Sequence, residues 1–251
     1  MILRLLGIPE TPLNQYVFLT IAGLTLYFTL SGISYLIFFV WGRKRFHPTY
    51  LPDQAANRSA MKWGVIGTIG NVVLMMPFHI LIANGHSQIY WDIGEYGWGW
   101  LIASFVLYLV FTETCIYWAH RWLHTDKGYH WLHKHHHEWR VTTSWVSMAF
   151  HPLDSFLQAL PHHLFGFIFP LYGPIYLVMV SFVSVWSVMI HDRVSFVRFK
   201  WINYTGHHTL HHWYYDYNYG QFFTFWDRLM GTWKDPEVVE KSGELPDGVL
   251  R

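Results

Sequence analysis

The sequence has few charged residues and a single cysteine. Aspartate, glutamate, lysine and arginine make up 13% of its 251 residues, whereas a soluble domain usually carries about a quarter. Much of the surface must therefore face something other than water. Cys115, being alone, excludes an internal disulfide and any metal site built from cysteines. The net charge of +1 argues against electrostatic capture of nucleic acid, so no nucleic-acid partner is expected.

Long apolar runs are present instead, in four places, and only Glu113 interrupts one of them with a charge. Residues 16–41 contain no charged residue and are long enough to cross the roughly 30 Å hydrocarbon core of a bilayer. Residues 63–83 and 98–119 are two further candidate spans. Residues 155–190 are too long for one span and too short for two full spans with a turn. We expect this last run to form a hairpin that bends at residues 170–174 and returns to the face where it began.

The sequence therefore predicts an all-α integral membrane protein with about four transmembrane or hairpin helical elements. The loop between the first two runs is basic, with Arg43, Lys44, Arg45, Arg58 and Lys62. Residues 84–97, between the second and third runs, contain no lysine or arginine, so the positive-inside rule places the first loop in the cytoplasm. We expect residues 1–97 to form two N-terminal membrane spans, residues 98–234 a catalytic domain and residues 235–251 a C-terminal tail.

Histidine is the residue that the sequence has in excess. There are 18, and only His47, His79 and His86 lie outside residues 120–212. Eight of them are spaced by three or four residues, which places side chains on one face of a helix. They form three histidine boxes: His120 and His124; His133, His136 and His137; His208, His211 and His212. His130 and His207 fit the same faces by spacing, whereas His135 points to the opposite side and is expected not to bind metal.

Eight imidazoles exceed the four ligands of a tetrahedral zinc ion, and they suit two metal ions that each keep an open position. Imidazole binds Fe, Zn, Cu and Ni, so the ligand type alone leaves the metal open. Soluble di-iron bundles use Glu-x-x-His pairs, which are missing from this region. All three boxes follow spans that return the chain to the cytoplasm. We therefore expect a cytoplasmic, histidine-rich cap that holds a dimetal centre.

The ligand rings must be neutral, and the second ring nitrogen of each needs an acceptor that fixes its orientation. Four carboxylates are candidate acceptors: Glu113, Asp192, Asp216 and Asp227. Glu113 lies seven residues before His120, and an acidic residue within an apolar span usually faces a functional interior; its alternative is a place among the lipid headgroups. His151 either supports the metal site in the same way or caps the turn before Pro152. His162 and His163 are expected to form hydrogen bonds rather than to bind metal.

Five stretches of the sequence carry a resemblance to a known family. They are HRWLH (120–124), HKHHH (133–137), AFHPLDSFLQALPHH (149–163), MIHD (189–192) and HHTLHHWYYDYNYGQFFTFWDRLMG (207–231). Together they resemble the fatty acid hydroxylase/sterol desaturase superfamily, over about residues 100–234. The FHPLD and NYGQF neighbourhoods are most similar to the sterol C5-desaturase branch.

The resemblance implies an oxidoreductase with two non-haem irons that uses O₂ to introduce a double bond between C5 and C6 of a sterol. The implied iron ligands are the eight histidines of the boxes, and His191 in MIHD matches a further histidine expected near the metals. The implied substrate is a sterol-like lipid from the bilayer. The sequence has no dinucleotide-binding, P-loop or haem motif. Electrons are therefore expected from cytochrome b5 with its reductase, or from a ferredoxin in a bacterium. The expected membrane is the endoplasmic reticulum or, in a bacterium, the inner membrane.

Two other functions remain open at this point. A sterol or fatty acyl hydroxylase of the same superfamily would differ only in whether the substrate radical gains oxygen or loses a second hydrogen. A histidine-rich membrane metal carrier or sensor would distribute its ligands along a path through the membrane. The sequence gathers the boxes at one depth, which favours the enzyme.

Overall fold

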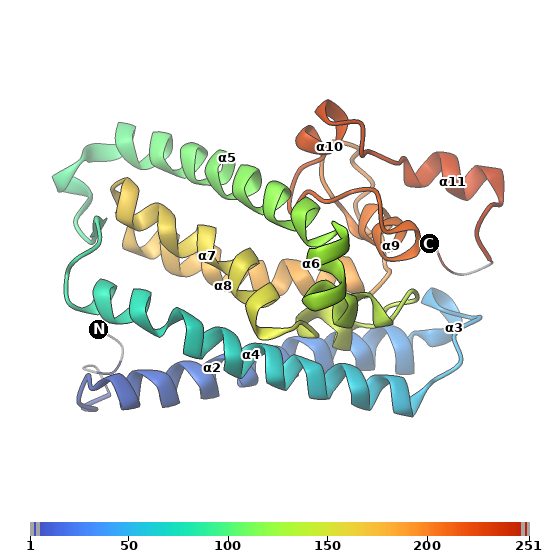
Figure 1. The fold of residues 1–251 in the computed structure, drawn as a ribbon, viewed down its shortest axis with the longest axis horizontal. Coiled ribbons are helices and arrows are strands. Elements are labelled where there is room, and N and C mark those ends of the chain that lie inside the picture. The colour runs from blue at the N-terminus through green and yellow to red at the C-terminus, as the bar shows by residue number, and fades with distance from the viewer. Residues whose placement is uncertain (1–2, 4–5, 247–248, 250–251) are drawn as a thin grey trace.

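The computed structural model describes Leu3, residues 6–246 and Val249, and this part of the chain is mostly helical, with only two short strands (Figure 1). Four helical segments are long and apolar enough to cross a membrane: Pro12–Trp41, Gln54–Ala83, Gly97–Leu123 and Gly173–His191. The predicted fold class, an all-α membrane protein with about four spanning or hairpin elements, is confirmed.

The first two spans begin at side-chain caps. Helix α2 (Pro12–Ser34) starts where the Thr11 hydroxyl accepts a hydrogen bond from Asn14 N, and it continues as the π-helical segment η1 (Tyr35–Trp41). After the short α3 (Arg43–Phe46), the Asp53 carboxylate caps α4 (Gln54–Ala83) by accepting from two backbone N–H groups. Such caps satisfy amide groups that have no partner within the helix. Strand β1 (Ile89–Tyr90) and the 3₁₀ turn η2 (Ile93–Glu95) then lead to the third span, α5 (Gly97–Leu123).

The predicted hairpin is present. Helix α7 (Pro152–Ile168) runs away from the histidine boxes, the chain turns through β2 (Leu171–Tyr172), and α8 (Gly173–His191) returns. Strand β2 pairs in parallel with β1, which fixes the turn against the loop between α4 and α5. The turn therefore begins slightly before the expected bend, and Pro174 lies in the first turn of α8, where a missing N–H costs nothing.

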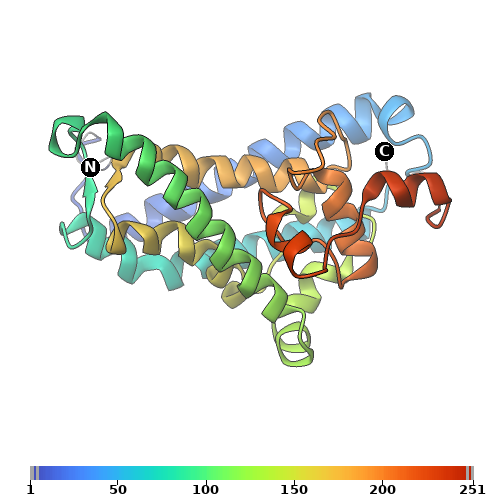
Figure 2. The same cartoon turned by 90° about the horizontal axis from the view of Figure 1, so that it is seen from above.

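The remaining elements gather at one end of the bundle, as Figures 1 and 2 show. They are α6 (Asp126–Trp131), η3 (His133–Glu138), η4 (Ser144–Met148), α9 (Thr205–Tyr214), α10 (Phe225–Leu229) and α11 (Pro236–Ser242). At the same end α5 and α8 finish and α4 begins. All three histidine boxes consequently lie at one end of the membrane-crossing helices, as the order of spans predicted.

Glycines on one side of α4 let other segments approach closely. A Cβ atom built on Gly64 would meet the ring of Tyr27, and one on Gly67 would lie 2.8 Å from the carbonyl oxygen of Phe150. A Cβ on Gly70 would collide with Pro152. Small residues are the usual means by which membrane helices pack this tightly. Gly64 therefore lets α2 approach α4, whereas Gly67 and Gly70 let the end of η4 and the start of α7 lie against α4, close to the histidine boxes.

Candidate metal centre

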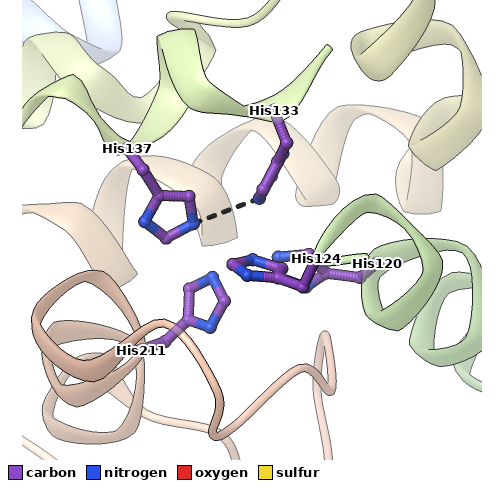
Figure 3. A group of neighbouring side chains, drawn as sticks. All are labelled: His120, His124, His133, His137 and His211. Atoms are coloured by element: carbon purple, nitrogen blue, oxygen red, sulfur yellow. Dashed lines mark hydrogen bonds between the residues drawn. The ribbon is translucent and has the colours of Figure 1, made fainter. Parts of the chain in front are cut away.

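Nine histidines form two groups in the cap. The five-histidine group consists of His120, His124, His133, His137 and His211, and the four-histidine group of His136, His191, His208 and His212. Within each group, one nitrogen of every ring lies within 4.8 Å of the others. Figure 3 shows the five-histidine group, whose rings come from the end of α5, from η3 and from α9 and point toward a common centre. The structure thus brings together every histidine that the sequence proposed as a ligand.

The second and third boxes are each divided between the two groups. His133 and His137 turn toward the five-histidine group, whereas His136, between them on the 3₁₀ turn η3, turns toward the other. On α9, His208 and His212 lie four residues apart in the four-histidine group, and His211 faces the five-histidine group. The sequence placed each box on a single helix face. The boxes instead lie between the two groups, so neighbouring side chains reach in different directions.

Hydrogen bonds to carbonyl groups fix the proton on four of the rings. In each of these rings the Nδ1–H group donates to a backbone carbonyl. His120 donates to Tyr219 (2.9 Å) and His191 to Ser187 (2.6 Å), while His211 donates to Tyr217 (2.8 Å) and His212 to Trp139 (3.1 Å). A carbonyl oxygen only accepts, so the proton must be on Nδ1. The Nε2 atom of each ring is then unprotonated and carries the lone pair that can bind a metal.

These lone pairs face one another. His191 Nε2 lies 3.3 Å from His212 Nε2, although both rings carry their proton on Nδ1, so no hydrogen bond can form between the two atoms. His208 Nε2 and His136 Nε2 lie 3.0 and 3.3 Å from the same atom of His191. Two nitrogens at about 2.0–2.1 Å from one ion are separated by roughly 2.8–3.4 Å at octahedral or tetrahedral angles. The four-histidine group therefore has the spacing of ligands around one cation.

The five-histidine group fits a second cation. In the part of the chain that the structure describes, the buried Nε2 atoms of His120, His124 and His211 have no hydrogen-bond partner. Buried polar atoms are nearly always paired, so three unpaired ring nitrogens that converge on one point are suited to bind a cation. His137 Nε2 lies 3.1 Å from His133 Nε2 in the same group.

Burial also keeps the ligand rings neutral. Desolvation, followed by repulsion from neighbouring rings, holds the pKa of five cap histidines well below 6.5: His136, His137, His208, His211 and His212. A neutral imidazole is a ligand and an imidazolium is not. The cap is thus prepared for cations at physiological pH.

Asp154 is an acceptor that the sequence reasoning missed. Its carboxylate is fully buried, and Oδ2 accepts the Nδ1–H of His133 at 2.7 Å while Oδ1 accepts Gln158 Nε2 at 2.7 Å. A carboxylate behind a histidine raises the basicity of the ring and fixes its orientation toward a metal. The available signal was the FHPLD motif, in which a buried acid follows the start of a helix.

Glu113 and Asp227 contact the backbone behind a candidate ligand, and not the ligand ring itself as predicted. Glu113 is buried, as expected, but its oxygens accept the backbone N–H groups of residues 221, 222 and 223. Asp227 accepts Tyr219 N at 2.8 Å and Gly220 N at 2.9 Å, and burial raises its pKa to about 6. Both carboxylates hold the loop of residues 219–223, which supplies the carbonyl of Tyr219 to His120. They position a ligand through the backbone rather than by contact with its ring.

The structure places the other predicted acceptors away from the ligand rings. The carboxylate of Asp192 accepts Val194 N (2.9 Å) and the Ser34 hydroxyl (3.4 Å), so it closes the turn after α8. Asp216 is exposed. His151 caps α7 by accepting Leu153 N at 3.3 Å, which is the second of its two expected roles. These positions are set by local turn geometry, which outweighs closeness in sequence to a ligand.

The histidines left open by spacing are now resolved. His135 stacks on Trp63 with ring centroids 4.0 Å apart, away from both groups, as predicted. His130 is exposed and bonds to the carbonyl of Asp126. His207 accepts the indole N–H of Trp233 at 3.2 Å. None of the three belongs to either group.

A cavity of about 210 Å³ reaches the two groups from between the helices. His120 of the five-histidine group lines it, as do three rings of the four-histidine group. The rest of its wall comes from α4, α5, α7, α8 and the 219–221 loop, with apolar side chains such as Ile116 and Val183. His162 and His163 also line this cavity and lie outside both groups. An apolar molecule in the cavity would lie beside the candidate metal sites.

Comparison with known proteins matches the fatty acid hydroxylase family model to residues 105–232. The Delta(7)-sterol 5(6)-desaturase ERG3 of Candida albicans is 42% identical over 231 residues, which are 90% of this chain and 58% of that protein. Lathosterol oxidase of Homo sapiens is 40% identical over 225 residues, 88% of this chain and 74% of that protein. The ERG3 desaturase of Saccharomyces cerevisiae is 40% identical over 228 residues, 90% of this chain and 61% of that protein. The chain thus spans 58% to 74% of these relatives. No solved structure matches it.

Proposed function

The chain belongs to the fatty acid hydroxylase family, and on that premise we propose that it is a membrane-bound sterol C5(6)-desaturase with two non-haem irons. The observation that carries the proposal is the convergence of nine buried histidines into two groups beside one cavity between the helices. The relatives at 40–42% identity, which are named as sterol 5(6)-desaturases and lathosterol oxidase, support the substrate class and the reaction.

One iron would be held by the five-histidine group and the other by the four-histidine group. Loaded with iron and supplied with O₂ and electrons, the centre would provide the oxidising power to remove hydrogen from an unactivated carbon, which no side-chain base can do. The protein's own contribution is orientation. The carbonyl acceptors and Asp154 keep the proton on Nδ1 in five of the nine rings, and the lone pairs of these rings stay aimed inward.

The cavity would hold the lipid beside the centre and keep water away. Its apolar wall suits a ring system that leaves the bilayer between helices. We propose that the end of the bundle with the cap faces the cytoplasm, because α3 is basic and the beginning of α4 carries Arg58 and Lys62. Electrons would then arrive there from cytochrome b5 and its reductase, or from a ferredoxin. Residues 98–234 would form the catalytic domain and residues 1–97 its membrane anchor.

Complementation tests the proposal. The full chain is expressed in a host that lacks sterol C5(6)-desaturation, and the sterols are analysed by mass spectrometry, with the His124→Ala variant as the inactive control. The proposal expects a sterol lighter than the substrate by two hydrogens in the strain with the wild-type chain, and no such product in the strain with His124→Ala. A product heavier by one oxygen would make the protein a hydroxylase. Purified protein with variable zinc or copper, and no O₂-dependent turnover, would indicate a metal carrier instead.

A further inference from the structure

Three buried polar atoms on side chains that line the cavity outside the two histidine groups lack a hydrogen-bond partner within the described residues: His162 Nε2, Gln221 Oε1 and, on α4, Asn71 Oδ1. His162 is 2% exposed. A buried polar atom left unpaired costs about 1–3 kcal/mol. None of the three side chains contributes to the two histidine groups, so metal binding does not account for them.

Tyr108 fixes which proton His162 presents to the cavity. The Tyr108 hydroxyl is fully buried and lies 2.6 Å from His162 Nδ1. The phenol has no other hydrogen-bond partner within the described residues, so it donates its proton to Nδ1, and the proton of the neutral ring is then on Nε2. His162 therefore offers an N–H donor to whatever occupies the cavity.

Gln221 supplies the complementary acceptor. Its backbone is held at both ends, because its N–H donates to Glu113 Oε1 at 3.0 Å and its carbonyl accepts the indole N–H of Trp186 at 2.8 Å. Its side chain lies beside the ring of His162 and interacts weakly with it, but Oε1 and Nε2 do not meet in hydrogen-bonding geometry. The pair thus presents one donor and one acceptor side by side, in a cavity whose other walls are largely apolar.

A hydroxyl group matches this pair, because it accepts one hydrogen bond and donates another. A ketone would accept from His162 and leave Gln221 unpaired, and a hydrocarbon would satisfy neither. We propose that His162 and Gln221 bind the hydroxyl group of an otherwise apolar lipid and so set which carbon lies beside the histidine groups. The inference deepens the proposed desaturase function and rests on it for the identification of that lipid as a sterol.

The test compares hydroxylated and deoxygenated substrates. Iron-loaded full-length protein is assayed for kcat/KM with a 3-hydroxysterol, its 3-ketone and its 3-deoxy analogue. Wild type is expected to favour the hydroxysterol over the deoxy compound by about 10- to 100-fold, with the ketone between them. In Gln221→Met, which leaves both backbone contacts in place, and in His162→Phe, the preference should fall to within about threefold. His79→Phe changes a half-buried histidine on α4 that contacts His163 without lining the cavity, and it should keep the wild-type preference.

The outcomes separate the inference from the function beneath it. Equal turnover of hydroxysterol and deoxysterol by wild type would overturn the inference while the desaturase function stands. An unchanged preference in both variants would overturn it as well and leave the pair as a water site. If no sterol is turned over, the desaturase proposal fails. The inference is then tested by the melting temperature of wild type with hydroxysterol against deoxysterol, and with a long-chain alcohol against its alkane. Equal stabilisation by both members of each pair overturns the inference.

Discussion

Replacing Asp154 with asparagine changes the hydrogen bonds behind His133 without changing the volume of the side chain. Both carboxylate oxygens accept, one from His133 Nδ1 and the other from Gln158 Nε2, each at 2.7 Å. An asparagine has a single acceptor oxygen, so its NH₂ group must face one of these two donors. Either Gln158 turns its amide oxygen to this NH₂ group and His133 keeps a neutral acceptor in place of a carboxylate, or His133 moves its proton to Nε2 and ceases to be a ligand.

The expected size follows from the burial of the pair. Both side chains are fully buried, so solvent does not screen the loss. Changes to such supporting carboxylates cost about 10- to 100-fold in metal affinity or activity, which is about 1.4–2.8 kcal/mol. We expect Asp154→Asn to bind iron more weakly by that factor and to lose desaturation in proportion.

The assay is iron titration of metal-stripped protein, followed by product analysis by mass spectrometry. Asp216→Asn is the matched control, because this carboxylate is exposed, and it should bind iron as wild type does. Wild-type iron affinity in Asp154→Asn would refute the view that His133 is a ligand oriented by this carboxylate.

Three further predictions concern the cap and its support. Gly67→Leu should lower the melting temperature and the iron content, because a Cβ there meets the Phe150 carbonyl, while Gly99→Ala, which faces open space, should change neither in the same melts and metal assays. His211→Ala should abolish sterol turnover and His135→Ala should retain it; an inactive His135 variant would contradict its stacking outside the site. The folded-state pKa of the buried cap histidines lies below the unfolded value of 6.5. The unfolded chain therefore binds more protons below that pH, so metal-stripped protein should be most stable above pH 6.5 and should lose stability as the pH falls. The raised pKa values of the buried Asp192 and Asp227 act in the opposite direction, but the histidines with lowered pKa values are more numerous. Thermal unfolding between pH 8 and 5 checks this, and a flat profile would contradict it.

The features that the sequence predicted correctly are those set by length and local pattern. Apolar runs long enough for the bilayer became helices, and the run of residues 155–190 became a hairpin because its length admits few other arrangements. The common location of the boxes followed from counting crossings. None of these inferences needs to know which helices touch.

The supporting contacts were harder to predict because they join residues far apart in the chain. Asp154 reaches His133 across 21 positions, and Glu113 reaches the loop of residues 221–223 across more than a hundred. Closeness in sequence favoured Asp192, which directly follows a ligand candidate, yet a turn takes its carboxylate elsewhere. His191 itself was found only through resemblance, because a lone histidine at the end of a helix has no spacing to read.

The division of the second and third boxes has a consequence for assembly. His136 and His137 are consecutive residues in different groups, and so are His211 and His212. If each group holds one ion, ordering the backbone around either ion prearranges two ligands of the other. Loading should be cooperative: on gradual addition of iron, fully charged and empty molecules should coexist, with few molecules holding just one ion.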